Sequence, residues 1–352
     1  MKELFLLDPD VVYLNHGSFG ACPRPVFETY QALQRELELQ PVAFLALERG
    51  LGARLDVARE RLASYVGARP DDLVLVPNAT SAVNVVARSL RLGPGDEVLL
   101  GDAEYGGLEL MWQFIARRTG AVLRRAPFAD LEPGPKTRVV FCSHIEWTTG
   151  RVNDLTDVCR RAREAGALSI VDGAHAPGQI PLDLEALGAD VYTGNAHKWL
   201  CAPKGAAFLW ARPEAQPLIE PMIVSWDWDE EKPFAETHRW QGTRDPAAYL
   251  SVPAAIDFQA SHDWPAVRAR CHNLLASLEL PFVPLTDSFA QMRGFRVEHP
   301  DPAALKRRLY DEHRIEIPVV ETASGWVMRV SVQAYNDESD LAALQRALAV
   351  EL

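Results

Sequence analysis

Reactive side chains are concentrated in two short runs, Asp172-Gly-Ala-His175 and Asn195-Ala-His197-Lys198. Each run begins where a predicted strand ends. A carboxylate at the end of a buried strand needs a partner, because moving an uncompensated charge out of water is costly. A lysine in a partly desolvated site loses its proton more easily and can form a Schiff base. The same two residues would also suit a helix-capping aspartate and a solvated surface lysine.

A lysine together with a carboxylate for the ring nitrogen is the minimum apparatus for binding pyridoxal phosphate. A candidate phosphate site lies at residues 76–81, Val-Pro-Asn-Ala-Thr-Ser, which join a predicted strand to a predicted helix. Free backbone N–H groups at the start of that helix, with the Thr80 and Ser81 hydroxyls, would suit a phosphate. Simple helix capping by Thr80 or Ser81 is the alternative interpretation.

The elements that must position these residues alternate between strands and helices. Strand patterns occur at 73–76, 97–100, 122–124, 138–142, 168–171, 189–193 and 206–209, and helical patterns at 80–90, 107–119 and 154–165. This alternation predicts an α/β fold with a mostly parallel, doubly wound sheet. Ligands of such sheets bind beyond the carboxyl ends of the strands, where both reactive runs lie.

The pattern changes near residue 251. One long helix is expected over 255–278, then strands at 282–285 and 292–298, and a helix over 302–313 capped by Asp301. Further strands at 315–320 and 326–332 precede a closing helix at 339–350, which predicts a smaller C-terminal α+β domain. The expected units are an N-terminal segment at 1–25, a large domain at 26–250 and a small domain at 251–352. A long loop at 213–239 connects elements of the large domain.

Composition narrows the class of protein. The chain of 352 residues has 36 Lys and Arg against 48 Asp and Glu, a formal charge of −12. An acidic chain with no basic block is a poor match for nucleic acid or an anionic membrane surface. The apolar runs are shorter than the ~20 residues of a spanning helix. Five scattered cysteines without a CxxC pair favour a reducing compartment, so we expect a cytoplasmic protein.

Several motifs together resemble the class V aminotransferase superfamily, which comprises fold-type I enzymes that depend on pyridoxal phosphate. In chain order they are Asn78-Ala79-Thr80, Tyr105, His144-x-Glu146-x-x-Thr149-Gly150, Asp172-x-x-His175, His197-Lys198-Trp199, Pro203-Lys204-Gly205 and Arg329-x-Ser331. Two further segments, Leu14-Asn15-His16-Gly17-Ser18-Phe19-Gly20 and Trp240-Gln241-Gly242-Thr243-Arg244-Asp245, are similar to the isopenicillin N epimerase-like branch. The resemblance covers nearly the whole chain.

The resemblance implies a role for each matching residue around the cofactor ring. Lys198 would hold pyridoxal phosphate as an internal aldimine and move the substrate proton. Asp172 would keep the pyridine nitrogen protonated, and Tyr105 would stack on the ring. His175 and Thr148 would lie near the 3′-oxygen.

The same resemblance implies where the phosphate and the substrate bind. Four residues would surround the phosphate: Ala79, Thr80, Asn195 and His197. Gly242 and Thr243 would reach the phosphate from the neighbouring subunit, which implies a homodimer with shared active sites. Arg329 would grip the substrate α-carboxylate, a task that suits a bidentate guanidinium, and Asn15 and His16 would line the substrate side.

These features predict a pyridoxal-phosphate enzyme acting at the α-carbon of an amino acid or a related amine, as an epimerase or a transaminase. A C–S or β-elimination lyase is the alternative. The stretch 314–328 contains no cysteine, which disfavours the desulfurase mechanism of this superfamily. Two remoter alternatives are a metal-dependent hydrolase using Asp172 and neighbouring histidines, and a non-catalytic binding protein. No HExxH or comparable metal-ligand spacing is present, so no metal site is expected.

Overall fold

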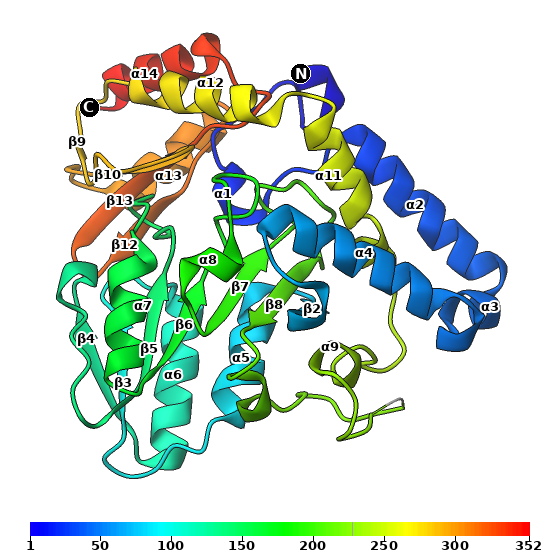
Figure 1. The fold of residues 1–352 in the computed structure, drawn as a ribbon. Coiled ribbons are helices and arrows are strands. Elements are labelled where there is room, and N and C mark those ends of the chain that lie inside the picture. The colour runs from blue at the N-terminus through cyan, green and yellow to red at the C-terminus, as the bar shows by residue number, and fades with distance from the viewer. Residues whose placement is uncertain (227) are drawn as a thin grey trace.

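A seven-stranded sheet forms the centre of the larger part of the molecule in the computed structural model, which describes residues 1–226 and 228–352 (Figure 1). Across the sheet the strands are β2 (Leu73–Val76), β8 (Ala207–Ala211), β7 (Val191–Asn195), β6 (Leu168–Asp172), β5 (Thr137–Ser143), β3 (Glu97–Gly101) and β4 (Val122–Ala126). Strand β8 runs antiparallel to both of its neighbours, and the other pairings are parallel. The prediction of a mostly parallel α/β sheet is therefore confirmed.

Helices cover both faces of this sheet. Successive strand residues alternate between two cores: Val139 and Phe141 pack with α5 (Ala79–Ser89) and α6 (Gly106–Thr119), whereas Val140 and Cys142 pack on the opposite side. That opposite side carries α4 (Leu51–Val66) and α7 (Leu155–Glu164). The strands are rich in Val, Leu and Ile because both of their faces are buried.

A smaller part holds the antiparallel sheet of β12 (Val319–Thr322), β13 (Gly325–Ser331), β10 (Met292–Arg296) and β9 (Val283–Pro284). It is accompanied by α12 (Trp264–Ala276), α13 (Pro302–Asp311) and α14 (Glu338–Glu351) (Figure 1). The expected cap is present, since the Asp301 side chain accepts a hydrogen bond from the Ala304 N–H at 2.8 Å. The chain start joins this part, because β1 (Val12–Tyr13) pairs in parallel with β11 (Ile315–Glu316).

The expected single helix over 255–278 is wrong. The structure has α11 (Val252–Ala260) and α12 instead, separated by a break in which Asp263 adopts a left-handed φ of 44°. Pro265 explains the break: proline removes a backbone donor and fits only the first turn of a helix. It follows the cap Asp263 and so begins a new helix.

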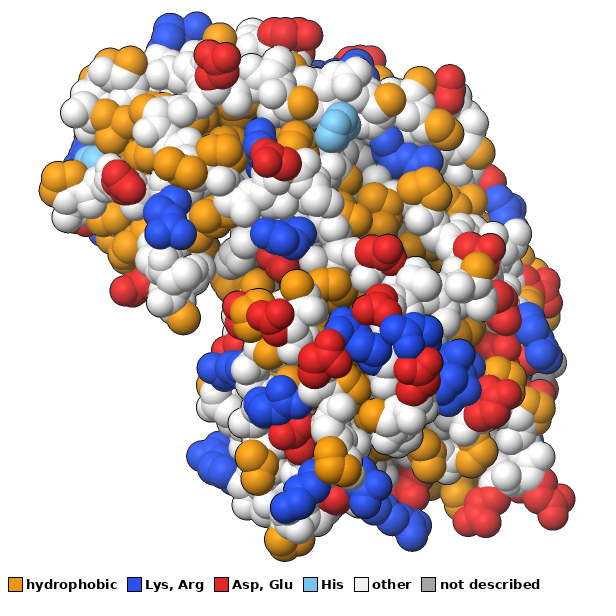
Figure 2. All heavy atoms as spheres, turned by 60° about the vertical axis from the view of Figure 1, so that its left-hand side comes forward, with side chains coloured by type: hydrophobic (Ala, Val, Ile, Leu, Met, Phe, Trp, Pro, Cys, Tyr) orange, Lys and Arg blue, Asp and Glu red, His pale blue; other side chains and the backbone are white. Residues whose placement is uncertain are grey.

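The remaining helices are short, apart from α2 (Arg24–Leu39). They are α1 (His16–Phe19), α3 (Pro41–Leu45), α8 (Leu184–Leu187), α9 (Phe234–Thr237) and α10 (Ala247–Leu250), with 3-10 turns at Lys2–Leu4, Leu47–Arg49, Pro70–Asp72, Phe128–Asp130 and Gln216–Leu218. Within the described ranges, no helix is long and apolar enough to span a bilayer. On the face drawn in Figure 2, Lys and Arg are interspersed with Asp and Glu rather than gathered into one patch.

Candidate active site

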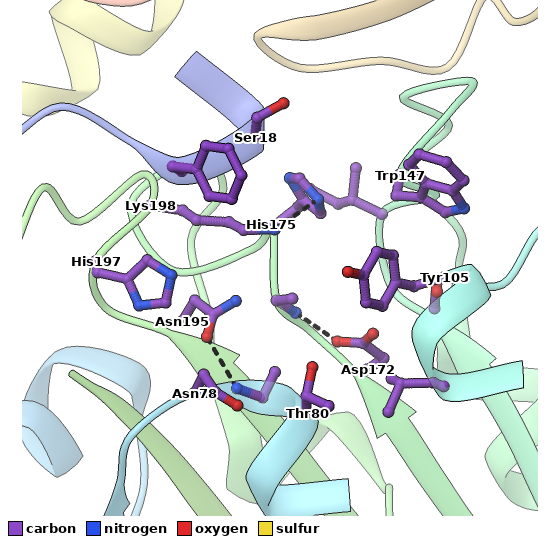
Figure 3. A pocket seen from close by; sticks show the side chains of 16 residues that line it. Ser18, Asn78, Thr80, Tyr105, Trp147, Asp172, His175, Asn195, His197 and Lys198 are labelled. Atoms are coloured by element: carbon purple, nitrogen blue, oxygen red, sulfur yellow. Dashed lines mark hydrogen bonds between the residues drawn. The ribbon is translucent and has the colours of Figure 1, made fainter. Parts of the chain in front are cut away.

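A cavity of about 190 Å³ lies where β6 and β7 end and α5 begins (Figure 3). Most of the predicted catalytic and cofactor residues line this one cavity: Ala79, Thr80, Tyr105, Asp172, His175, Asn195, His197 and Lys198. They converge because the carboxyl ends of neighbouring parallel strands meet at the same edge of the sheet. Ser18, Phe19, Asn78, Ser143, Ile145 and Trp147 also contribute to the wall.

Lys198 is a half-buried amine beside a neutral imidazole. Its Nζ lies 3.1 Å from His175 Nε2, and Trp199 Nε1 donates to His175 Nδ1 at 3.2 Å. Burial and nearby positive charge hold the pKa of His175 well below its usual value. A neutral His175 that accepts at Nδ1 must carry its proton on Nε2, so it can donate to the Lys198 nitrogen only in the fraction of molecules whose amine is neutral.

The electrostatics of the cavity also favour that neutral amine. Burial and, to a smaller extent, the positive charge of Arg329 lower the pKa of Lys198 from 10.5 to about 8, while Asp172 opposes both effects. A lysine with such a pKa is a nucleophile for carbonyl compounds near neutral pH.

Asp172 is a buried carboxyl at the end of β6. Its Oδ1 accepts the Ala174 N–H at 2.9 Å, and within the described chain no cationic nitrogen lies within 4.0 Å of it. Burial raises its pKa. A buried carboxylate without a cationic partner is costly. The protonated ring nitrogen of a bound pyridoxal phosphate would supply that partner.

A second buried carboxyl, that of Glu104, lies behind the cavity wall. Glu104 was not predicted as a site residue from the sequence. It accepts hydrogen bonds from the Ser143 N–H at 3.0 Å and the Ser143 hydroxyl at 2.6 Å. Burial is the main cause that raises the pKa of Glu104 to about 8. At neutral pH Glu104 is therefore mainly protonated.

The start of α5 has the groups of an anion site. The Asn78 side chain caps this helix by accepting the Ser81 N–H at 2.8 Å, so neither Thr80 nor Ser81 is the cap. The Thr80 side chain lines the cavity instead. Asn195 Oδ1 accepts the Ala79 N–H at 2.9 Å, which ties the end of β7 to this turn. The N–H groups of Ala79 and Ser81 are thus already bonded, and the Thr80 N–H and hydroxyl are the groups of this turn that suit a phosphate.

Aromatic rings form the side of the cavity opposite Lys198 (Figure 3). Tyr105 precedes α6 and remains 44% exposed, and its ring meets that of Trp147 edge-on with centroids 5.8 Å apart. Trp147 is itself held by a hydrogen bond from Nε1 to the Glu104 carbonyl at 3.0 Å. An accessible tyrosine ring can stack on a planar ligand. The cavity residues therefore fit pyridoxal phosphate.

Arg329 lies on β13. It does not line the cavity itself but bonds to two residues that do. Its Nη1 donates to the Trp147 carbonyl at 2.7 Å, and its Nη2 donates to Ser18 Oγ at 2.8 Å and Asn15 Oδ1 at 3.2 Å. Among the residues that the structure describes, no carboxylate pairs with it, and its Nε has no partner. Burial lowers the pKa of Arg329 to about 10. A buried guanidinium with only neutral acceptors suits an incoming carboxylate.

Six predicted site residues do not line the cavity: Asn15, His16, Thr148, Gly242, Thr243 and Arg329. Asn15 instead bridges Arg329 and Glu316. The His16 ring is fully buried against the Lys198 carbonyl and the Tyr335 hydroxyl, and its expected place on the substrate side stays a prediction. Gly242 and Thr243 lie between α9 and α10, outside the cavity of their own chain.

The chain is similar to known proteins over nearly its whole length. The aminotransferase class-V family matches residues 13–344. Isopenicillin N epimerase of Amycolatopsis lactamdurans is 39% identical over 99% of this chain and 96% of its own length, and that of Streptomyces clavuligerus is 38% identical over 97% and 95%. A solved complex of the cystine C–S lyase C-DES with its product cysteine persulfide has a TM-score of 0.85 and 26% identity, and covers 97% of this chain and 98% of the lyase.

Proposed function

Because the chain belongs to the class-V aminotransferase family and is a pyridoxal-phosphate-dependent enzyme, we propose that it acts at the α-carbon of an amino acid or a related amine, as an epimerase or a transaminase. The observation that carries this proposal is the meeting of Lys198, Asp172 and Arg329. A reactive amine and a buried carboxyl without a cation line one cavity, and a buried guanidinium without an acid bonds to Trp147 and Ser18 in the wall of that cavity. The cofactor would supply a carbonyl for the amine and a protonated ring nitrogen for the carboxyl, and the substrate would supply a carboxylate for the guanidinium.

Pyridoxal phosphate, when bound, supplies a carbonyl that captures an amino group and a protonated ring that accepts the electron pair released at the α-carbon. Lys198 would carry the cofactor, and Asp172 would hold the proton on its ring nitrogen. Thr80, Asn195 and the first turn of α5 would bind the phosphate. The accessible ring of Tyr105 would limit its tilt.

Lys198 also has the properties of the proton carrier. Its pKa of about 8 leaves a useful fraction of both protonation states near neutral pH, as a general acid and base requires. Transamination needs a proton transfer on the face that Lys198 serves. Epimerisation needs a second group on the other face, and Tyr105 lies across the cavity from Lys198 (Figure 3). We assign that second role to the Tyr105 hydroxyl or to a water that it holds.

Arg329 would orient the substrate through its α-carboxylate. Its guanidinium is held from two directions, by Trp147 and by Ser18, so its direction is set before the substrate arrives. Replacing Arg329 by Gln should weaken the binding of α-carboxylate substrates while cofactor binding persists. Equal affinity for an amino acid and its carboxyl-free amine in the wild-type enzyme would remove Arg329 from the site.

We also propose a homodimer with shared sites. Gly242 and Thr243 lie outside their own cavity, and the exposed apolar side chains Met222, Ile223 and Trp226 precede them in the chain. Burying such side chains against a second copy would stabilise a dimer. Sedimentation equilibrium tests this, and a monomer at micromolar concentration that retains full activity would refute it.

A C–S or β-elimination lyase is the second candidate, supported by the structural similarity to the C–S lyase. The persulfide chemistry of a desulfurase lacks its nucleophile here, since no cysteine occurs between residues 314 and 328. Cys201 is buried, its sulfur lies against the His16 ring and the Trp199 carbonyl, and burial raises its pKa. A lyase activity would therefore release its sulfur product directly.

The test is a panel of amino acids incubated with the holoenzyme in deuterated water. Epimerisation predicts both enantiomers with deuterium at the α-carbon and no keto acid. Transamination predicts a keto acid with conversion of the cofactor to its amine form. Elimination predicts pyruvate or sulfide from substrates with a β-leaving group. Lys198→Ala is the control, and covalent borohydride-stable cofactor in that variant would refute the assignment of Lys198.

A further inference from the structure

Residues 15–20 form a short segment that contacts both ends of the proposed reaction site. On one side, Asn15 Oδ1 and Ser18 Oγ accept hydrogen bonds from Arg329, and the Ser18 hydroxyl donates to Asn15 Oδ1 at 2.6 Å. On the other side, His16 and Gly20 lie against the main chain of Lys198. One segment thus contacts the proposed substrate-binding arginine and the backbone of the proposed cofactor lysine.

The His16 imidazole has one defined protonation state. Its Nε2 lies 3.0 Å from the Lys198 carbonyl oxygen, and its Nδ1 lies 3.0 Å from the Tyr335 hydroxyl. Burial lowers the pKa of His16 to about 3, so the ring is neutral at physiological pH. The carbonyl can only accept, so a proton on Nε2 satisfies it and leaves Nδ1 to accept the proton of the Tyr335 hydroxyl. The side-chain nitrogen of Gln333 also lies 3.3 Å from Nε2. The ring is also packed on Trp199, with centroids 4.8 Å apart.

Gly20 brings the same segment against Lys198 from a second direction. Its φ is 70°, and a Cβ there would lie 2.2 Å from the His197 carbonyl oxygen and 2.9 Å from Lys198 Cα. Only glycine permits this approach and this conformation. The Lys198 carbonyl additionally accepts the Cys201 N–H at 3.0 Å. The Lys198 peptide is therefore held by hydrogen bonds and by direct packing.

We propose that His16 is a positioning residue for Lys198, an inference that rests on the proposed role of Lys198 as the cofactor lysine. The lysine side chain extends from its Cα, so the position and direction of the main chain set the range of positions that Nζ can reach. The His16 Nε2–H bond fixes the Lys198 carbonyl and, with it, the point from which the side chain extends. Loss of that bond should slow covalent capture of the cofactor, because small misplacements of a reacting group are costly.

Two amide variants separate this role from simple packing. His16→Gln places an amide N–H near the position of Nε2 and can still donate to the Lys198 carbonyl. His16→Asn places its amide near Nδ1, where it can pair with Tyr335 but cannot reach Lys198. The matched control is His272→Asn, since His272 Nδ1 also contacts a backbone carbonyl, that of Ala290 at 3.1 Å, but belongs to α12.

The experiment adds pyridoxal phosphate to each apoenzyme and follows the visible absorbance of the bound cofactor, with borohydride reduction and mass spectrometry at set times. His16→Asn should capture the cofactor about tenfold more slowly than the wild type, whereas His16→Gln should remain within about threefold. The His272→Asn control should match the wild type. Capture by His16→Asn at the wild-type rate, with the wild-type pH dependence, would overturn the proposal.

Folding and the underlying assignment are checked separately. Circular dichroism of each apoenzyme reports on folding, and if His16→Asn does not fold, His16→Phe keeps the ring shape without the donor and should show the same slow capture. Wild-type capture by His16→Phe would then overturn the proposal. If the wild type captures no cofactor, or Lys198→Ala captures it covalently, the role of Lys198 fails and this inference fails with it.

Discussion

The reactivity of Lys198 in the apoenzyme should titrate far below that of an ordinary lysine. Burial is the largest cause that lowers its pKa from 10.5 to about 8. A shift of this size increases the neutral fraction of the amine at pH 7 by about 300-fold, to roughly one tenth of the molecules. The neutral amine attacks carbonyl and acyl reagents, so Lys198 should be the most reactive lysine of the chain at that pH.

Two charge variants should move that titration in opposite directions. Arg329 is the second cause that lowers the pKa of Lys198, so Arg329→Gln should raise the apparent pKa. Asp172 favours the charged amine, so Asp172→Asn should lower the apparent pKa. The sign of each change follows from Coulomb interactions in a buried site, where screening by water is weak.

The assay is pulse acetylation of the apoenzyme between pH 6 and 10, with mass spectrometric counting of modified Lys198. Lys2, which is half exposed, serves as the internal reference in every sample. An apparent pKa of 10 or higher for Lys198 in the wild type would refute the argument from burial. A fall in the apparent pKa of Arg329→Gln would refute the electrostatic account.

Three other perturbations have defined outcomes. Asp172→Asn should still bind pyridoxal phosphate covalently but lose about 100-fold or more in turnover, the usual cost of one preorganised electrostatic partner, as steady-state kinetics would reveal. Tyr105→Phe should keep cofactor affinity while Tyr105→Ala weakens it by up to about tenfold in equilibrium titration, because the stacking face is lost. Gly150→Ala should cost at least about 3 kcal/mol in urea unfolding, since a Cβ would lie 2.1 Å from the Met292 carbonyl oxygen. The matched Gly166→Ala has a similar φ of 72° but open space and should cost only about 1–2 kcal/mol.

The large sheet and the residues at its strand ends were predictable from the sequence. Asp172 follows a strand that is buried on both faces, so its apolar run is continuous and its end is distinct. Lys198 lies three residues after β7, the neighbour of β6, and adjacent parallel strands bring their ends together. Local pattern and topology were sufficient to place both residues at one cavity.

Long-range contacts were not predictable in the same way. The direction of the His16 ring depends on Tyr335, which is 319 positions away in the chain. Trp147 enters the cavity wall from a turn, and Phe19 enters it from the four-residue helix α1, which is too short to show a periodic pattern. The choice of Asn78 over Thr80 as the cap of α5 is a shift of two residues, which is within the usual uncertainty of helix ends.

The pairing of the two chain ends sets an order in time for the assembly of the site. Strand β1 pairs with β11, and His16 bonds to Tyr335. Residues 12–16 therefore cannot adopt their final contacts until residues 315–335 have been synthesised. During synthesis, Lys198 leaves the ribosome on the order of ten seconds before Arg329 and Tyr335. In that interval the nascent chain has Lys198 but neither Arg329 nor the tyrosine that bonds to His16. Synthesis of residues 315–335 is thus needed before the segment that carries Asn15 and His16 can take its place beside Lys198.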